Sequence, residues 1–92
     1  MRVYQSEASR KLDIQFTAPR DGDAGYDLFS IADYEVSAGK TVLVETGLHV
    51  EIPSGYVGLV KDRSSVASAG LHSLAGVIDS AYRGEVKILL LN

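Results

Sequence analysis

The stretch Leu48-His-Val-Glu-Ile-Pro-Ser-Gly-Tyr-Val-Gly-Leu-Val60 decides the fold class, because it places two short apolar runs on either side of a turn. The first run alternates between apolar and polar residues with a period of two, which is typical of a half-buried strand. Similar short runs occur at Leu12–Phe16, Thr41–Val44 and Val86–Leu91. This pattern predicts an all-β fold.

Turn-forming residues separate the predicted strands and leave little room for helices. Ser37–Lys40 has the composition of a turn, and Ala18–Asp23 has that of a loop. Only Arg63–Gly70 suits one or two helical turns, and we expect Ser64 or Ser65 to be the N-cap.

The most apolar run, Val86–Leu91, lies at the end of the sequence. Such a strand needs neighbours on both edges, because an unpaired edge invites association with other chains. We therefore expect either that another subunit covers this strand or that the sequence is part of a longer chain. We favour the second explanation.

The composition restricts the class of protein. The 92 residues suit one small domain spanning 1–92, and 46% of them are hydrophobic, so a folded core is expected. The absence of cysteine fits a reducing compartment. The net charge is −3 with acidic and basic residues interspersed, so no nucleic-acid partner is expected. The sequence has no signal peptide and no membrane-spanning run, which predicts a cytoplasmic protein without a membrane partner.

The segment Asp62-Arg-Ser-Ser65 lies where the short helical turn would begin. An arginine and two hydroxyls beside the free N–H groups of a helix start supply donors for a phosphate group. The alternative is an ordinary serine N-cap next to a surface arginine. The segment alone does not decide between these interpretations.

The segment Asp23-Ala-Gly-Tyr-Asp27 places two acids around a glycine. One carboxylate here can hold a metal-bound water, because Mg²⁺ keeps several waters and needs few protein ligands. The alternative is a turn in which the aspartates bond to their own backbone. His49, expected on a strand surface, and His72, expected in a loop, do not have the spacing of zinc ligands.

Asp79 is the most informative single residue, because it follows the apolar Gly76-Val-Ile78. A buried and unpaired carboxylate is costly, so this acid is either paired, for example with Arg83, or kept for catalysis. A hairpin turn at Asp79-Ser80 is the other alternative. Tyr82 suits either strand packing or stacking on a flat ligand.

Taken in order, these segments resemble the three N-terminal motifs of the trimeric deoxyuridine triphosphatases (dUTP diphosphatases). The matching segments are Asp23–Leu28 for the first motif, Arg63–Ala67 with Gly70-Leu71 for the second, and Gly76–Glu85, closed by Asn92, for the third. The resemblance extends from Leu12 to Asn92. It implies a distorted jelly-roll or β-clip barrel, incomplete at the C-terminus.

The resemblance implies hydrolysis of dUTP to dUMP and pyrophosphate with Mg²⁺ as cofactor. Asp79 matches the carboxylate that activates the water attacking the α-phosphate. Tyr82 matches the aromatic residue that packs on the deoxyribose and leaves no room for a 2′-hydroxyl. Asp27 matches the acid that orients the hydration shell of Mg²⁺, so its contact with the metal is through water.

Six further residues match substrate-binding positions of the family: Arg63, Ser64, Ser65, Leu74, Gly76 and Val77. The first three belong to the segment that holds the phosphates. The last three belong to the hairpin whose backbone reads the uracil edge. The family forms homotrimers with shared sites, which implies that the phosphate segment of one chain faces the catalytic acid of another.

Some positions depart from the family pattern. Asp62 stands where a proline is usual, and we expect its negative charge to weaken triphosphate binding. Ser68-Ala69 replaces a commonly basic pair, and Ala81 stands where a polar or acidic residue is frequent. The fourth motif and the C-terminal arm would lie beyond Asn92, so we expect a truncated chain that lacks them.

Three rival interpretations stay open. A dCTP deaminase relative would share the fold, but Leu89 stands where that family has its catalytic glutamate. A non-catalytic nucleotide-binding or regulatory domain would keep the pocket without turnover, although such a domain has little use for Asp79. A structural jelly-roll module would not need the three ordered motifs.

Overall fold

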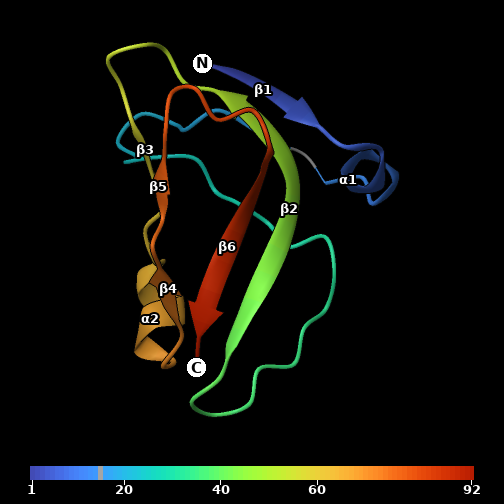
Figure 1. The fold of residues 1–92 in the computed structure, drawn as a ribbon, viewed down its shortest axis with the longest axis vertical. Helices are drawn as coiled ribbons and strands as arrows, with labels where there is room; N and C mark the ends of the chain where they lie inside the picture. Colours follow the sequence, from blue (N-terminus) through green and yellow to red (C-terminus); the bar gives the residue numbers. More distant parts are fainter. Residues whose placement is uncertain (15) are drawn as a thin grey trace.

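Two long antiparallel strands, β2 (Thr41–Glu51) and β6 (Glu85–Leu91), form the centre of the larger of two sheets. The computed structural model describes residues 1–14 and 16–92. The other elements are β1 (Arg2–Gln5), α1 (Glu7–Lys11), β3 (Gly58–Leu59), α2 (Ser64–Ser68), β4 (His72–Leu74) and β5 (Val77–Ile78) (Figure 1). The larger sheet has the order β1-β2-β6-β4, and β3 pairs with β5 in a separate sheet. The predicted predominance of strands is confirmed.

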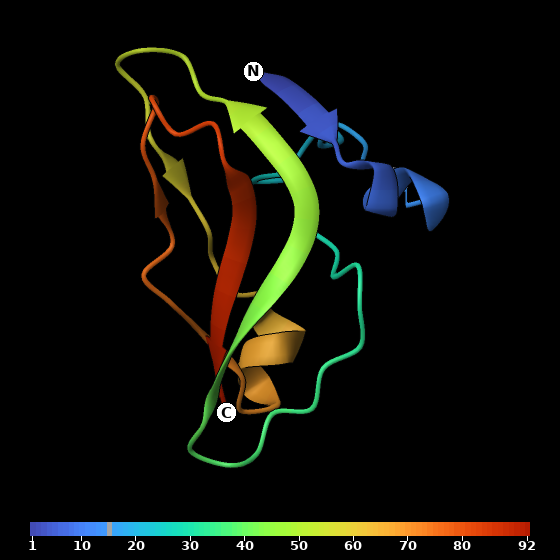
Figure 2. The same ribbon diagram turned by 45° about the vertical axis from the view of Figure 1, so that its right-hand side comes forward.

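Strand β2 joins two segments that the sequence predicts as separate strands, Thr41–Val44 and Leu48–Ile52. The strand is continuous from Thr41 to Glu51, and it bends strongly along its length (Figure 2). Its pairing with β6 shifts between Glu45 and Leu48, which is a β-bulge. A bulge increases the local twist and bends the strand, so one continuous strand can change direction without a turn between the two predicted segments.

Hydrogen bonds from buried side chains stabilise the bulge. The hydroxyl of Thr46, which is 2% exposed, donates to the carbonyl of Val86 and accepts from the N–H of Leu48. The N–H of Gly47 donates to Glu85 Oε2 at 3.2 Å. Gly47 has a φ of 68°, a conformation that glycine adopts without a steric penalty.

Strand β6 has a neighbour on each edge within this chain. β2 lies along one edge, and on the other edge β4 pairs with Leu89–Leu91 only, both antiparallel. The expectation that this apolar strand lacks a neighbour on one edge is therefore wrong for Leu89–Leu91. The sequence does not reveal β4 because this strand is only three residues long and lies directly before a sharp bend.

The hydrophobic core connects the larger sheet to the smaller one. Its buried members are Val50, Ile52 and Val86, and Val3, Leu28 and Ile78 pack against them. Gly58 of β3 lies close to this core, because a β-carbon added there would be 2.6 Å from Cδ1 of Ile52. The close approach holds the smaller sheet against the end of β2.

The N-terminal region differs from the prediction of a first strand at Leu12–Phe16. None of the described residues in that range lies in a strand, and Gln15 is outside the described residues. The first strand is β1, followed by α1, whose N-cap Ser6 accepts a hydrogen bond from the N–H of Ser9 at 3.2 Å. Asp13 has a φ of 55°, which strand geometry does not allow.

A long segment without helix or strand runs from residue 17 to residue 40 and carries the first motif. The predicted turn at Ser37–Lys40 is confirmed, because the N–H of Lys40 donates to the carbonyl of Ser37 at 3.0 Å. Asn92 ties this end of the segment to the sheet. Its side chain donates to the carbonyl of Val36 at 2.6 Å, and its own carbonyl accepts from Gly39.

Candidate active site

A hollow lies beside the bend that links β4 to β5. Its walls include five residues that the sequence singles out, namely Leu74, Gly76, Val77, Asp79 and Tyr82. Its volume is about 330 Å³, at the lower end of the range for ligand pockets. The structure therefore brings the predicted catalytic acid, the aromatic residue and the predicted uracil-reading backbone to one place.

Asp79 stands exposed at the end of β5, not inside a strand. It begins a turn in which the N–H of Tyr82 donates to the carbonyl of Asp79 at 3.1 Å. The alternative that Arg83 pairs with this acid is wrong, because the Arg83 guanidinium donates to the carbonyls of Ser80, at 2.7 Å, and Tyr82, at 3.1 Å. Among the described residues the Asp79 carboxylate has no ion-pair partner, so it can accept a proton from a bound water.

The ring of Tyr82 is held at the rim of the same hollow. Its hydroxyl donates to the carbonyl of Glu85 at 2.7 Å, and the residue is 45% exposed. Gly84 lies under the ring, since an added β-carbon would be 2.6 Å from the phenol oxygen and 2.8 Å from Cζ. The ring thus has a fixed hydroxyl end and an accessible face, which is the arrangement that stacking on a flat ligand requires.

The bend from Leu74 to Val77 joins strands of different sheets, so it is not the hairpin that the resemblance implies. Ala75 has a φ of 57° and Gly76 a φ of 90°. The carbonyl of Gly76 accepts from the N–H of Val60 at 2.8 Å, and a β-carbon at Gly76 would lie 2.9 Å from the carbonyl oxygen of Val60. Two successive left-handed residues point the peptide groups of this bend away from the regular pattern of a strand.

A second hollow lies between the first motif and α2. Arg63 and Asp27 both line it, and Arg63 Nη1 lies 3.9 Å from Asp27 Oδ1. Both side chains are well exposed, at 65% and 63%. A single exposed carboxylate at such a place fits a cation that keeps most of its waters, as Mg²⁺ does.

The two acids of the first motif have different surroundings. Asp23 Oδ2 accepts from the N–H of Arg20 at 3.0 Å and lies 3.5 Å from its Nε, so Asp23 closes a local turn. The turn interpretation is confirmed for Asp23. Asp27 instead faces Arg63 across the second hollow.

The prediction that Ser64 or Ser65 caps α2 is wrong. The N-cap residue is Arg63, and it makes no side-chain capping bond. Ser64 and Ser65 lie exposed in the first turn of α2. Their hydroxyls form no hydrogen bond with the part of the chain that the structure describes, which leaves both hydroxyls available to a ligand.

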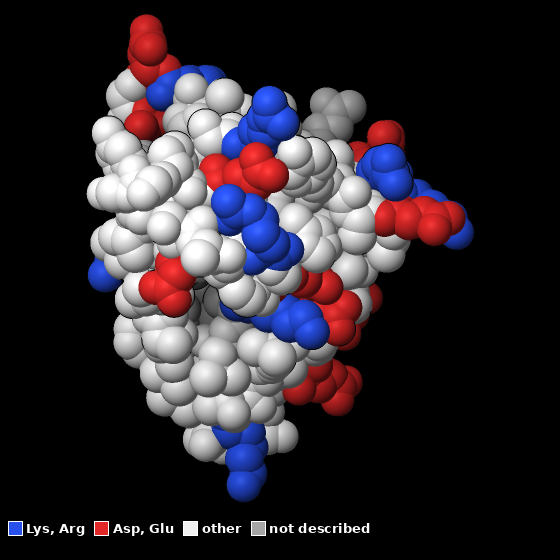
Figure 3. All heavy atoms as spheres, turned by 45° about the horizontal axis from the view of Figure 1, so that its top comes forward, with Lys and Arg blue, Asp and Glu red and all other residues white. Residues whose placement is uncertain are grey.

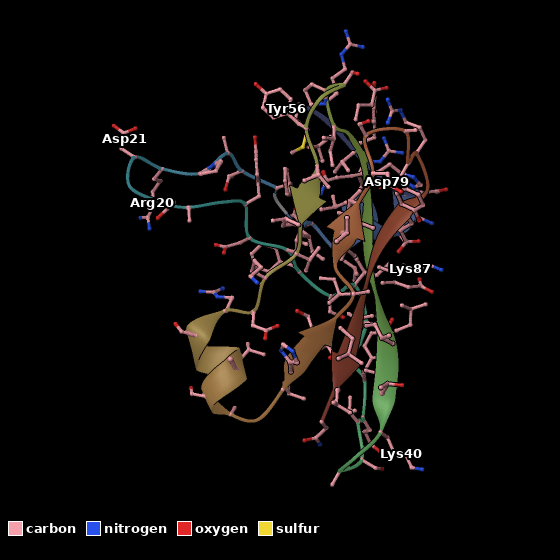
Figure 4. All side chains as sticks on the ribbon, turned by 60° about the vertical axis from the view of Figure 1, so that its left-hand side comes forward. Arg20, Asp21, Lys40, Tyr56, Asp79 and Lys87 are labelled. Carbon is pink, nitrogen blue, oxygen red and sulfur yellow. The ribbon has the colours of Figure 1, made fainter. Side chains whose placement is uncertain are left out.

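One chain does not bring the phosphate segment to Asp79. Of these two hollows, Arg63 and Asp27 line the second and not the first, and Ser64 and Ser65 line neither. Figure 4 shows Asp79 near the end of β5, at the opposite end of the β4–β5 segment from α2. The elements that the sequence predicts as one site are thus two separate surfaces of this chain.

A family model described as dUTPase matches residues 13–92. The chain belongs to the dUTPase family. It is 47% identical, over 93 aligned residues, to the deoxyuridine 5′-triphosphate nucleotidohydrolase of Mycobacterium sp. (strain JLS), and the match covers 95% of this chain and 60% of that protein. The chain is 49% identical to the same enzyme from Mycobacterium bovis (strain BCG / Pasteur 1173P2), where the match covers 78% of this chain and 49% of the relative.

Solved structures of dUTPases have the same fold. A mutant dUTPase from phage phi11 of S. aureus, described with a structural Mg(II) ion, superposes with a TM-score of 0.85 at 33% identity. That match covers 99% of this chain and 58% of the phage chain. Native EIAV dUTPase gives a TM-score of 0.80 at 33% identity, covering 85% of this chain and 65% of that one. The predicted dUTPase-like β fold is therefore confirmed, and this family member spans roughly half to two thirds of the relatives it matches.

Two features of this dUTPase-family chain were not found from its sequence. Asp62 bonds to His72 and to the N–H of Ser73, which places His72 in β4 and not in a loop. The rings of Phe16 and Tyr26 stack at a centroid distance of 5.0 Å. Each contact joins residues about ten positions apart in the sequence, and neither helical nor strand periodicity predicts such a contact.

Three further observations concern the surface charge, the length of the helices and groups of metal-binding side chains. On the face drawn in Figure 3, basic and acidic side chains alternate and do not form a continuous basic surface. No helix in residues 1–14 and 16–92 is long and apolar enough to cross a membrane. Within the same residues no group of three or more His, Asp or Glu side chains is arranged to hold a metal.

Proposed function

We propose that this chain acts as a dUTP diphosphatase, hydrolysing dUTP to dUMP and pyrophosphate. The observation that carries the proposal is the free and exposed carboxylate of Asp79, which shares one hollow with Tyr82 and the Leu74–Val77 bend in a dUTPase-family chain. Because the chain spans only part of its relatives, the activity of those relatives is a proposal for this chain.

Asp79 is the proposed general base. Its carboxylate accepts a proton from a water whose oxygen attacks the α-phosphorus, and the bond from that phosphorus to the bridging oxygen breaks, so pyrophosphate leaves. The exposed position of Asp79 supports this role, because a bound water can reach its carboxylate. Holding the water in line with the leaving group accounts for much of the rate enhancement.

Asp27 and the Arg-Ser-Ser segment are the proposed triphosphate-binding residues. Bound Mg²⁺ would neutralise charge on the triphosphate oxygens, and Asp27 would orient its water shell. Arg63 supplies a guanidinium and Ser64 and Ser65 supply hydroxyl donors. The exposed positions of these side chains on one hollow and on the first turn of α2 support the proposal.

Base and sugar selectivity are assigned to the first hollow. The peptide groups of the Leu74–Val77 bend, including Gly76, would hydrogen-bond to the uracil edge, so that cytosine would leave a buried polar group unpaired. The accessible ring of Tyr82 would pack on the deoxyribose and exclude a 2′-hydroxyl. The fixed hydroxyl of Tyr82, bonded to Glu85, supports this rigid packing.

The active form is proposed to be a homotrimer with shared sites, located in the cytoplasm. The separation of Asp79 from Ser64 within one chain supports the sharing, because the phosphate segment of a neighbour could complete the first hollow. The exposed apolar side chains of Leu43 and Val77, which line that hollow, support an interface there. The same separation favours a second candidate, a nucleotide-binding domain without turnover.

The deciding experiment measures pyrophosphate release from dUTP, dCTP and UTP with Mg²⁺ and with EDTA. Asp79→Asn should abolish release from dUTP while the affinity for dUTP persists. Asp21→Asn is the matched control, because it removes the same charge from an exposed loop tip (Figure 4). Sedimentation of the same samples gives the oligomeric state.

Each outcome selects one of the candidate functions. Release from dUTP alone, lost only in Asp79→Asn, supports the diphosphatase. Binding of dUTP without release supports the nucleotide-binding domain. Pyrophosphate release from dCTP would contradict the proposed uracil selectivity, whereas release of ammonia from dCTP would indicate a deaminase relative, despite Leu89 at the position of its base.

A further inference from the structure

The carboxylate of Asp62 closes the loop that carries the Arg-Ser-Ser segment. Oδ2 lies 2.5 Å from Nδ1 of His72, and Oδ1 accepts from the N–H of Ser73 at 2.8 Å. Both oxygens therefore bind to β4, on the far side of the loop. Asp62 is only 16% exposed, whereas its partner His72 is 66% exposed.

This carboxylate is ionised in the folded protein. Hydrogen bonds from Ser73, and then from His72, lower the pKa of Asp62 from 3.8 to about 2. A charged acceptor makes stronger hydrogen bonds than a neutral one. The link between Asp62 and β4 is therefore a strong contact at neutral pH.

The link is anchored in the larger sheet. Ser73 is paired with Leu90 of β6, so the N–H that Asp62 binds belongs to a residue held by the central strand. Two residues before Asp62, the N–H of Val60 donates to the carbonyl of Gly76 at 2.8 Å. Two successive contacts thus close the base of the loop between residues 60 and 76.

The start of α2 has little else to hold it. Its N-cap, Arg63, makes no side-chain capping bond, and the Arg63–Asp27 pair is long and exposed. The helix has five residues, which is too short for stability on its own. Asp62 is the residue directly before Arg63, so its contacts with β4 fix the point at which the segment leaves the sheet.

We infer that Asp62 is a positioning residue, which fixes Arg63, Ser64 and Ser65 relative to β4 through its bonds to Ser73 and His72. The inference rests on the proposed function for the identity of the ligand that this segment binds. It reverses the expectation from charge alone, in which Asp62 repels a triphosphate. The two interpretations predict opposite effects of Asp62→Asn on the affinity for dUTP.

The test compares Asp62→Asn, His72→Phe and the control Asp21→Asn with the wild type. His72→Phe keeps an aromatic ring at an exposed strand position and removes Nδ1, so its fold should be retained even where Asp62→Asn unfolds. Hydrogen exchange of the Ser73 amide, measured by NMR, reports the link without any need for turnover. Titration with dUTP in EDTA reports binding.

Positioning predicts that Asp62→Asn raises the exchange rate of the Ser73 amide by about tenfold and weakens dUTP binding by about tenfold, the effect of losing one hydrogen bond to a charged group. His72→Phe should change the exchange rate and the dUTP affinity in the same directions by smaller factors. Asp21→Asn should change neither quantity. The effects of Asp62→Asn and His72→Phe should not add in the double variant, because both remove the same link.

Two results would overturn the inference. The first is tighter dUTP binding by Asp62→Asn with unchanged exchange at Ser73, which is the outcome of charge repulsion alone. The second is unchanged exchange in both Asp62→Asn and His72→Phe. If the wild type does not bind dUTP, the proposed function fails, and the exchange data alone decide whether Asp62 holds the segment.

Discussion

The ring of Tyr82 lies over Gly84, so closely that a β-carbon at Gly84 would be 2.6 Å from the phenol oxygen and 3.0 Å from Cε1. Glycine at this position allows the ring to reach the carbonyl of Glu85. The orientation of the proposed sugar-packing residue therefore depends on a residue that has no side chain.

We expect Gly84→Ala to reduce selectivity for dUTP over UTP more than it reduces stability. The added methyl group meets the far end of an exposed side chain, which can rotate away, so the free energy of unfolding should fall by only about 1 kcal/mol, the value of one lost hydrogen bond. Competition binding of dUTP and UTP, with thermal unfolding on the same samples, measures both effects.

Tyr82→Phe is the matched variant for this prediction, because it loses the bond to Glu85 and keeps the ring over Gly84. It should retain more selectivity than Gly84→Ala. Gly25→Ala controls for the general effect of the substitution on stability, since an added β-carbon there meets no atom within 4 Å. Unchanged selectivity in Gly84→Ala would show that the ring position is irrelevant to the sugar.

We expect Arg63→Ala to weaken dUTP binding by about tenfold, because a hydrogen bond to a charged phosphate is lost. The free energy of unfolding should change by less than about 0.5 kcal/mol, since the pair with Asp27 is exposed and 3.9 Å long. The affinity of Arg63→Lys for dUTP should lie between those of the wild type and Arg63→Ala, because lysine keeps the charge and loses the planar set of guanidinium donors. Calorimetric titration and urea unfolding provide the measurements.

Arg20→Ala is the control for net charge, because Arg20 lies at the tip of the loop that also carries Asp21 (Figure 4). An equal loss of affinity in Arg20→Ala would mean that Arg63 acts only through the total charge of the protein. A large loss of stability in Arg63→Ala would instead give Arg63 a structural role.

The central strands are predictable from sequence because their apolar residues repeat with a period of two. The alternating segment Leu48–Ile52 lies in β2 up to Glu51, and the apolar run Val86–Leu91 lies in β6. The same rule fails at Leu12–Phe16, where Asp13 adopts a left-handed conformation and Leu12 is exposed. Alternation predicts a strand only where a neighbouring strand can pair with the segment, and none of the described strands pairs with this one.

The candidate site was predictable mainly through resemblance. Periodicity alone places Asp79 within an apolar run, but β5 ends at Ile78 and leaves the acid exposed. The contact of Asp62 with His72 was not predictable, because it depends on how a loop closes against a sheet and not on local composition. The serine N-cap prediction failed for a similar reason, since the chain enters α2 from Asp62 with Arg63 at the cap position.

We expect Thr46→Val to lower the free energy of unfolding by about 1–3 kcal/mol, although the volume hardly changes. The variant removes a buried hydroxyl that bonds to Val86 and Leu48 at the bulge of β2. Thr41→Val, at an exposed position of the same strand, should change stability by less than about 0.5 kcal/mol. If the two substitutions lowered the free energy of unfolding equally, the buried hydroxyl of Thr46 would not contribute to stability through its bonds at the bulge.

The last prediction concerns acid stability. The pKa of Asp62 is about 2 in the folded state and 3.8 as an ordinary aspartate, so the folded state binds fewer protons between these values. The stability that Asp62 contributes is therefore complete above 3.8 and is lost as the pH falls through about 2. Asp62→Asn does not titrate, so the wild type should be more stable than this variant near neutral pH, and the difference should shrink across that window.

Urea unfolding of the wild type, Asp62→Asn and Asp21→Asn at a series of pH values between about 6 and about 2 measures this difference. The Asp21→Asn curve should stay parallel to the wild-type curve, because Asp21 lies exposed at a loop tip, away from Asp62 and β4 (Figure 4). A constant gap between the wild type and Asp62→Asn down to about pH 2 would mean that the bonds to Ser73 and His72 do not depend on the charge of Asp62. The gap would then come from replacing an acceptor oxygen by an amide nitrogen at the start of the Arg-Ser-Ser segment, and not from losing the charge.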